Sequence, residues 1–120
     1  MALLFIEARG FTSAVTEYFG DDEAYRRFQN DLAKNPEAGP VMTGTGHFRK
    51  LRWSDPGRGK GKRGGIRVVY IHIREIDTVF LADVYSKDEK DDLAPEAKRR
   101  LKTLCAERIE DLKRLYERAR

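Results

Sequence analysis

Apolar side chains recur along the first third of the chain at two spacings, which predict one strand followed by two helices. Residues 3–9 alternate in part between apolar and polar side chains, a pattern that favours a strand. Residues 11–19 and 24–32 carry apolar side chains at the spacing of an amphipathic helix. The second helix is expected to end near Asn35, because a residue before proline is disfavoured in the helical region.

The middle of the chain predicts three further strands. In residues 48–53 apolar and basic side chains alternate, so one face of this strand would be apolar and the other cationic. Residues 66–73 have the strongest strand pattern, and residues 76–85 are expected to pair with them as an antiparallel hairpin. Residues 55–65 are rich in glycine and basic side chains, which predicts a flexible loop.

The last part of the chain predicts a helix that starts around Asp91 and Asp92. Acidic side chains and Pro95 both suit the first turn of a helix. An apolar stripe runs along this helix, formed by Leu101, Leu104, Cys105, Ile109, Leu112 and Leu115.

The predicted order of elements is therefore β–α–α–β–β–β–α. Strands that follow one another, with helices at both ends, indicate an α+β fold: a small antiparallel sheet with two N-terminal helices and one C-terminal helix. The length of 120 residues fits a single domain, residues 1–120. A first half with two consecutive helices argues against a nucleotide-binding βαβ unit.

The positive charge of the chain is concentrated in one segment. The chain has 24 basic and 20 acidic side chains, a formal net charge of +4. Residues 47–70 hold eight of the basic side chains against Asp55 alone. A local excess of this kind is typical of a surface that binds nucleic-acid phosphates. The eight are Arg49, Lys50, Arg52, Arg58, Lys60, Lys62, Arg63 and Arg67.

A run of charged residues is most often only solvated surface. Two observations favour RNA binding here. Acidic neighbours that would neutralise the segment are almost absent, and the cations continue from the loop into the strands as Lys50, Arg52 and Arg67. Cations on rigid strands can hold a phosphate in a fixed geometry, whereas loop cations mainly add attraction.

Other kinds of site have little support in the sequence. The single Cys105 excludes an internal disulfide, and His47 and His72 have neither zinc-site spacing nor a pattern that pairs them for proton transfer. We therefore expect no metal and no cofactor. No apolar run approaches the ~18 residues of a membrane-spanning helix, so a cytoplasmic protein without membrane contact is expected.

The aromatic residues leave two roles open. Trp53 lies with Leu51 on the apolar face of its strand, which favours core packing. Tyr70 and Tyr85 stand at strand ends, where a tyrosine can pack in the core or stack on an RNA base.

Three motifs occur in order along the chain: GTGHFRKLRW at residues 44–53, GGIRVVY at residues 64–70 and YSKDEKDDL at residues 85–93. Together they resemble the RelE superfamily, specifically the HigB-like toxins of type II toxin–antitoxin systems. The resemblance covers about residues 20–100. It implies a RelE-like fold and an endoribonuclease, an mRNA interferase, that cleaves messenger RNA in the ribosomal A site and inhibits translation without a metal.

In the chemistry that the resemblance implies, the ribose 2′-OH attacks the adjacent phosphorus while cationic side chains stabilise the developing charge. Carried over by position, it implies catalytic roles for Lys50, Arg52, Arg67 and Lys87. Arg67 would stabilise the phosphate, and Lys50 would transfer a proton or act electrostatically in its place. The residues expected to bind RNA are Arg49, Arg58, Lys60, Lys62, Arg63, Tyr70, Tyr85 and Lys90.

The resemblance also implies a cognate helix-turn-helix antitoxin as partner, besides the ribosome and mRNA. An alternative is a non-catalytic RNA- or ribosome-binding protein, including a degenerate toxin that still binds its antitoxin. Two residues depart from the family pattern. His47 stands where close relatives often have a glycine, and Leu93 stands in place of a tyrosine that some RelE enzymes use near the C-terminal helix. The sequence leaves this alternative open.

Overall fold

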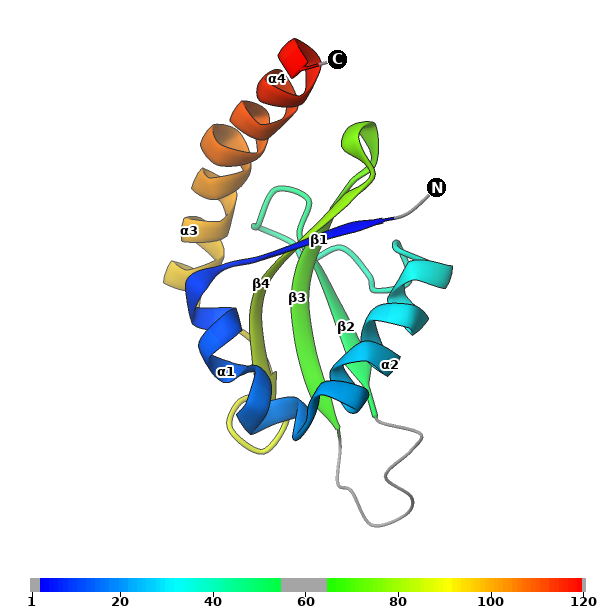
Figure 1. The fold of residues 1–120 in the computed structure, drawn as a ribbon. Coiled ribbons are helices and arrows are strands. Elements are labelled where there is room, and N and C mark those ends of the chain that lie inside the picture. The colour runs from blue at the N-terminus through cyan, green and yellow to red at the C-terminus, as the bar shows by residue number, and fades with distance from the viewer. Residues whose placement is uncertain (1–2, 55–64, 120) are drawn as a thin grey trace.

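The computed structural model describes residues 3–54 and 65–119 (Figure 1). Its elements follow the order expected from the sequence. They are β1 (Leu4–Glu7), α1 (Arg9–Phe19), α2 (Asp22–Lys34), β2 (Arg49–Trp53), β3 (Ile66–Ile73), the short 3-10 helix η2 (Arg74–Ile76), β4 (Thr78–Ser86), α3 (Pro95–Leu104), the π-helical turn η3 (Cys105–Ile109) and α4 (Glu110–Ala119). The last three form one continuous helical segment along one side of the molecule (Figure 1).

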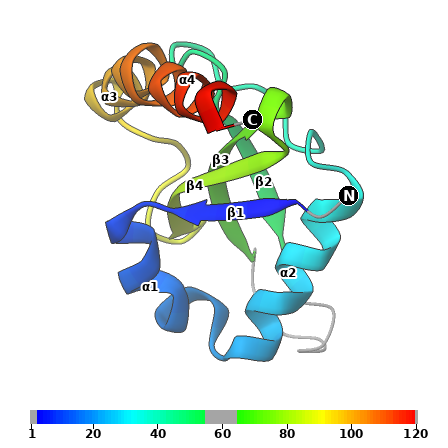
Figure 2. The ribbon, with the colours of Figure 1, turned by 45° about the horizontal axis from the view of Figure 1, so that its top comes forward.

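The strands form one four-stranded sheet in the order β1-β4-β3-β2. The α+β class is confirmed, but the sheet is mixed rather than antiparallel. The pairs β2–β3 and β3–β4 are antiparallel as predicted, whereas β1 runs parallel to β4. The reason is that α1 and α2 carry the chain away from β1, so the next strand starts at the opposite edge (Figure 2).

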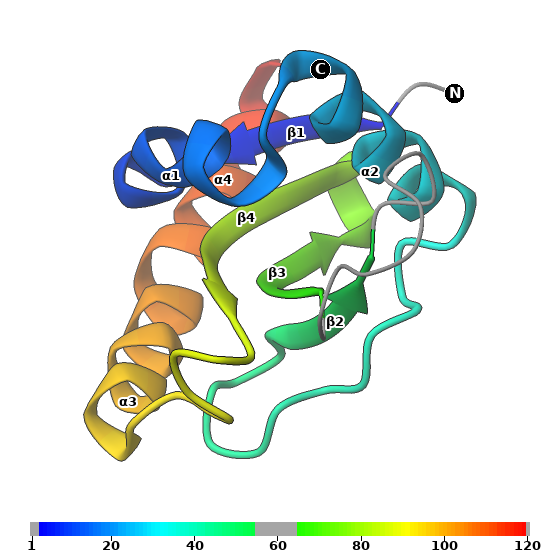
Figure 3. The same cartoon turned by 90° about the horizontal axis from the view of Figure 1, so that it is seen from below.

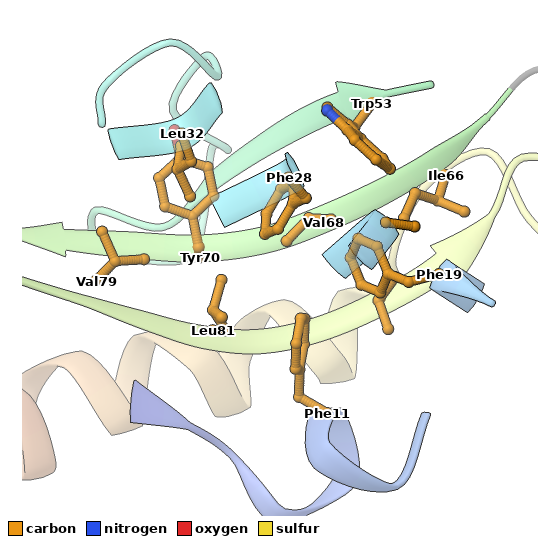
Figure 4. Close-up of a cluster of buried hydrophobic side chains, with 12 residues drawn as sticks. Phe11, Phe19, Phe28, Leu32, Trp53, Ile66, Val68, Tyr70, Val79 and Leu81 are labelled. Carbon is orange, nitrogen blue, oxygen red and sulfur yellow. The ribbon is translucent and has the colours of Figure 1, made fainter. Parts of the chain in front are cut away.

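One face of the sheet packs against α1 and α2. The apolar positions of the two helices and alternate positions of the strands meet in an aromatic core (Figure 4). Phe19 lies at its centre, with ring centroids 5.1 Å from Phe28 and 5.7 Å from Trp53. Trp53 is therefore a core residue, as its alternation with basic side chains predicts, and its indole N–H donates to Asp31 at 3.1 Å.

The other face of the sheet packs against the C-terminal helical segment. A second cluster of buried side chains fills this layer: Met42, Phe48, Val69, Ile71, Ile73, Tyr85, Leu93 and Ile109. The single cysteine, Cys105, packs against this cluster from the helical segment, in agreement with a structural role. No helix in the described ranges has the length and apolar character that crossing a membrane requires.

Local chemistry accounts for the ends of several elements. Asp21 caps α2, because its carboxylate accepts the backbone N–H of Ala24 at 2.8 Å. The connector after α2 is held to the sheet by Gly39, whose N–H donates to the hydroxyl of Tyr70 at 3.1 Å. The final helix starts at Pro95, later than the acidic residues Asp91 and Asp92 that suggested its start.

Candidate functional site

Cationic side chains of β2 and β3 meet in one row across the sheet. Arg52 in β2 is the register partner of Arg67 in β3, and Arg67 is the register partner of Tyr85 in β4. Register partners project from the same face with Cβ atoms about 5 Å apart. Tyr85 is the last but one residue of β4, so the row lies at the end of the sheet from which the chain continues to α3. Figure 3 shows the path of the chain from β4 to α3. We call Arg52, Arg67 and Tyr85 the arginine row.

The two arginines of this row differ in exposure. Arg52 is exposed, whereas Arg67 is only 6% exposed. Burial fixes the Arg67 guanidinium more firmly than that of a surface arginine, and like charges on directly opposed positions of a sheet repel each other. An anion such as a phosphate bound beside both groups would accept hydrogen bonds from them.

Lys50 lies on the same face of β2 as Arg52, two residues earlier and about 7 Å away along the strand. Its Nζ is 3.4 Å from Oδ1 of Asp92, a residue of the segment that joins β4 to α3. The second oxygen of Asp92, Oδ2, lies 2.7 Å from Nζ of Lys98 in α3. One carboxylate thus connects the edge of the sheet with the first turns of the final helix.

The chemistry around Asp92 favours its ionised form. Hydrogen bonding from Lys98 lowers the pKa of this carboxyl. Partial burial raises the pKa, but the hydrogen bond from the backbone N–H of Leu93 and the charge of Lys50 lower it further. The N–H of Leu93 donates to Oδ1 at 2.8 Å. The Leu93 side chain is buried in the second apolar cluster, which fixes this turn of the chain against the sheet.

Lys87 and Lys90 belong to the same joining segment, and both are exposed. The ammonium of Lys90 lies 4.9 Å from the ring centroid of Tyr85, within the range of a cation–π contact. The segment is tied to α1 as well, because the Tyr18 hydroxyl donates to Glu89 at 2.5 Å. This hydrogen bond raises the pKa of Tyr18, so the phenol stays neutral.

The predicted stacking of Tyr70 and Tyr85 on RNA bases is not supported. Tyr70 is fully buried in the core under α1 and α2, and its hydroxyl is bonded to the connector at Gly39. Tyr85 is 2% exposed, so its ring cannot meet a base in this conformation. Its hydroxyl is buried and has no hydrogen-bond partner within the described residues. Burial raises the pKa of this phenol, with Asp92 adding to the effect and Arg67 opposing it.

Arg49 also differs from the expectation that it binds RNA. Its guanidinium turns towards the connector and donates to the backbone carbonyls of Glu37 and Gly39 at 3.0 and 2.8 Å. As a neighbour of Lys50 in the strand it faces the opposite way. Arg49 therefore holds the connector after α2 to the sheet, and the structure does not bring it to the arginine row.

The two histidines lie at the other end of β3. His72 Nδ1 is 2.9 Å from Glu37, and this hydrogen bond is the main reason why the pKa of that carboxyl is lowered. His47 and His72 line one pocket of about 430 Å³ together with Glu37. Five residues of strand, about 16 Å, separate His72 from Arg67. The histidines and the arginine row therefore cannot contact the same phosphate.

Four of the cations expected to bind RNA lie outside the described residues: Arg58, Lys60, Lys62 and Arg63. Two contributors to the site were missed at the sequence level, Asp92 and Lys98. In the sequence, Asp92 is typical of a helix start, and no local pattern distinguishes Lys98. The spacing of six residues between them spans the turn into α3 and gave no signal of a contact.

Within residues 3–54 and 65–119 there is no group of three or more histidine, cysteine or acidic side chains with an arrangement that could hold a metal ion. The basic side chains of the arginine row and its surroundings are instead suited to anions. They can bind and orient a phosphodiester and stabilise negative charge on its oxygens.

No family model matches this chain. Among solved structures, the fold is similar to a mutant of the Escherichia coli toxin RelE in the free state, with a TM-score of 0.48 and 20% sequence identity over 76% of this chain and 90% of that chain. It is also similar to the intact E. coli RelBE toxin–antitoxin complex, with a TM-score of 0.47 and 20% identity over 71% of this chain and 96% of that chain.

Proposed function

We propose that this protein is the toxin of a type II toxin–antitoxin system and acts as a ribosome-dependent mRNA endoribonuclease. The observation that carries the proposal is the register pairing of Arg52 with Arg67, with Lys50 on the same face and Lys87 and Lys90 in the segment beside it. This arrangement supports contact with a single phosphodiester from several directions. The order and content of the three sequence motifs support the same function.

In the proposed reaction, the ribose 2′-oxygen forms a bond to the adjacent phosphorus while the bond from phosphorus to the 5′-oxygen breaks. The products are a 2′,3′-cyclic phosphate and a free 5′-hydroxyl, so one proton leaves the 2′-OH and one is delivered to the 5′-oxygen. Arg67 and Arg52 would stabilise the charge on the non-bridging oxygens. Lys87 would stabilise the leaving oxygen or orient the RNA.

The experiment is a map of 5′ ends in cellular mRNA after induction of the wild type and of Arg67→Lys and Arg67→Ala. The wild type should arrest growth and produce new 5′ ends within translated regions. Arg67→Ala should abolish both effects, whereas Arg67→Lys should keep a small part of the activity because a lysine supplies charge without the bidentate geometry. Arg26→Ala, which removes a charge at an exposed position of α2, is the matched control.

Arg67 is buried, so each variant must first be shown to be folded by circular dichroism and by its thermal midpoint. Normal growth with intact transcripts after induction of folded wild-type protein would contradict the proposal. Binding to ribosomes without any cleavage would instead support a non-catalytic ribosome-binding protein. Degradation of naked RNA by the purified protein would argue for a ribosome-independent nuclease.

The proposed partner is a cognate antitoxin of the helix-turn-helix class, and the proposal of a toxin implies its gene beside that of this protein. Co-expression with the product of a small neighbouring gene should restore growth and yield a complex that co-purifies. No such rescue by either flanking gene would argue against a toxin–antitoxin pair.

A further inference from the structure

We infer that Asp92 is a positioning residue for Lys50 and holds its side chain in a fixed place beside the arginine row. The inference rests on the proposed function and extends it, because it assigns a role to a residue that lies in no catalytic position of the motif comparison.

The geometry places Asp92 between two ammonium groups. Oδ1 lies 3.4 Å from Nζ of Lys50, and Oδ2 lies 2.7 Å from Nζ of Lys98. Lys98 is anchored in α3, so it fixes one oxygen of the carboxylate while the other faces the strand. The Asp92 carboxylate is itself fixed by the backbone N–H of Leu93, whose side chain is buried. The carboxylate is therefore rigid on the side that meets Lys50.

A rigid anion restricts where the long lysine side chain can lie. Lys50 is partly buried, with a side chain 26% exposed, and a long lysine side chain loses conformational entropy when it is held in one position. The ion pair supplies this restriction before substrate arrives. Without it, Lys50 would have to be ordered during the reaction, which lowers the rate rather than the affinity for RNA.

The same contact places the Lys50 side chain where it can act on a bound phosphate. Lys50 lies on the face of β2 that also carries Arg52, so the ion pair with Asp92 holds its positive end next to the arginine row. From this place it can stabilise negative charge on the phosphorane oxygens.

The first test compares Asp92→Asn with Asp91→Asn, which makes the same change in charge at the adjacent exposed residue. Asparagine keeps an oxygen acceptor for the N–H of Leu93 but loses the charge that holds Lys50. We expect the single-turnover cleavage of mRNA on purified ribosomes to fall about fivefold in Asp92→Asn, the factor that corresponds to an ion pair of ~1 kcal/mol. Binding to ribosomes should be unchanged or slightly tighter, because one negative charge is lost.

A double-mutant cycle separates positioning from a general structural role. If Asp92 acts through Lys50, Asp92→Asn should have no further effect on the rate when Lys50 is already methionine. A purely structural role of Asp92 would reduce the rate by the same factor in both backgrounds. The thermal midpoints of all four proteins show whether stability follows a different pattern from activity.

The second test addresses the electrostatic role of Lys50 and uses Lys50→Arg and Lys50→Met. Arginine stays charged, so an electrostatic role predicts that Lys50→Arg keeps at least tenfold more activity than Lys50→Met. Equal inactivity of the two variants would overturn the electrostatic role of Lys50. Equal rates for Asp92→Asn and Asp91→Asn would overturn the positioning role. If the wild type itself does not cleave mRNA on ribosomes, the proposed function fails, and that outcome is distinct from the other two.

Discussion

Arg67 in β3 and Tyr85 in β4 are register partners, and both side chains are buried at the end of the sheet where the arginine row lies. The Tyr85 hydroxyl has no hydrogen-bond partner within the described residues, and burial keeps the phenol neutral by raising its pKa. The pair therefore combines a fixed guanidinium with a buried hydroxyl that contributes no hydrogen bond to stability in this conformation.

This relationship predicts that Tyr85→Phe leaves the protein as stable as the wild type or stabilises it by about 1 kcal/mol. A buried hydroxyl without a partner carries a desolvation cost, and phenylalanine fills the same volume without it. The thermal midpoint and urea unfolding measure the effect. A clear loss of stability would show that the hydroxyl has a partner outside the described residues. Cleavage assays on the same variant report whether the hydroxyl contacts RNA.

A second prediction concerns the glycine that precedes β3. Gly65 has a φ of 62°, and a Cβ at this position would come within 2.4 Å of the carbonyl oxygen of Trp53. Gly65→Ala should therefore lose about 2 kcal/mol or more, from left-handed strain and from the displaced backbone of β2. Urea unfolding followed by the fluorescence of Trp53, the single tryptophan, measures the loss.

Gly10 provides the matched control, because it lies in α1 and a Cβ there would meet nothing within 4 Å. Gly10→Ala should be neutral or stabilise by up to about 1 kcal/mol through higher helix propensity. Similar destabilisation by both substitutions would mean that the close approach of the Trp53 carbonyl oxygen is not the reason why alanine at position 65 destabilises the protein.

A third prediction is a dependence of stability on pH through Glu37. The hydrogen bond from His72, followed by the charges of Arg74 and His72 itself, lowers the pKa of this carboxyl in the folded protein. In the unfolded chain a glutamate has an ordinary pKa of about 4.3, so the unfolded state takes up the proton first as the pH falls. The stabilisation by Glu37 is therefore present above that pH and is lost below it.

The measurement compares the wild type with Glu37→Gln by urea unfolding at several pH values. The difference in unfolding free energy should be largest near neutral pH and should shrink between about pH 5 and pH 3, where the protonated glutamate resembles glutamine. Glu17→Gln, at an exposed position of α1, serves as the control and should show a smaller dependence on pH. A constant difference over this range would contradict the prediction.

A fourth prediction follows from the loop cations, which lie outside the described residues. If they provide attraction to RNA without chemistry, replacing Lys60 and Lys62 by glutamine should weaken binding and reduce the salt dependence of the binding constant by about 0.7 per cation. The cleavage rate of bound RNA should stay the same. Lys34→Gln combined with Arg26→Gln removes two charges from α2 and should leave the salt dependence nearly unchanged. A lower cleavage rate at saturating RNA would show that Lys60 and Lys62 contribute to the cleavage step itself.

The sequence predicted the placement of the strand cations well, for a simple reason. Alternation in residues 49–53 puts Lys50 and Arg52 on one face, and period two is fixed by strand geometry. The register that sets Arg52 against Arg67 could not be predicted, because the segment between the two strands is long enough to permit several alignments. Only the pairing of the strands in space shows that Arg52 and Arg67 are register partners.

Tyr70 and Asp92 show why other parts of the site were not predictable. β3 is apolar on both faces because helices cover both sides of the sheet, so its pattern did not reveal which side chains are buried or where Tyr70 points. Asp92 has the composition of a helix start, but α3 begins at Pro95 and leaves the carboxylate available to Lys50. Both outcomes depend on contacts between distant segments, which local pattern does not encode.

The parallel pairing of β1 with β4 has a consequence for how the protein folds during its synthesis. During synthesis the first strand leaves the ribosome long before its partner, and the intervening chain must be made before Leu4 can pair with Thr78. Closing such a large loop is slow, and until it closes β4 presents an open edge to other strands. The sheet is therefore complete only after β4 has been made and β1 has paired with it.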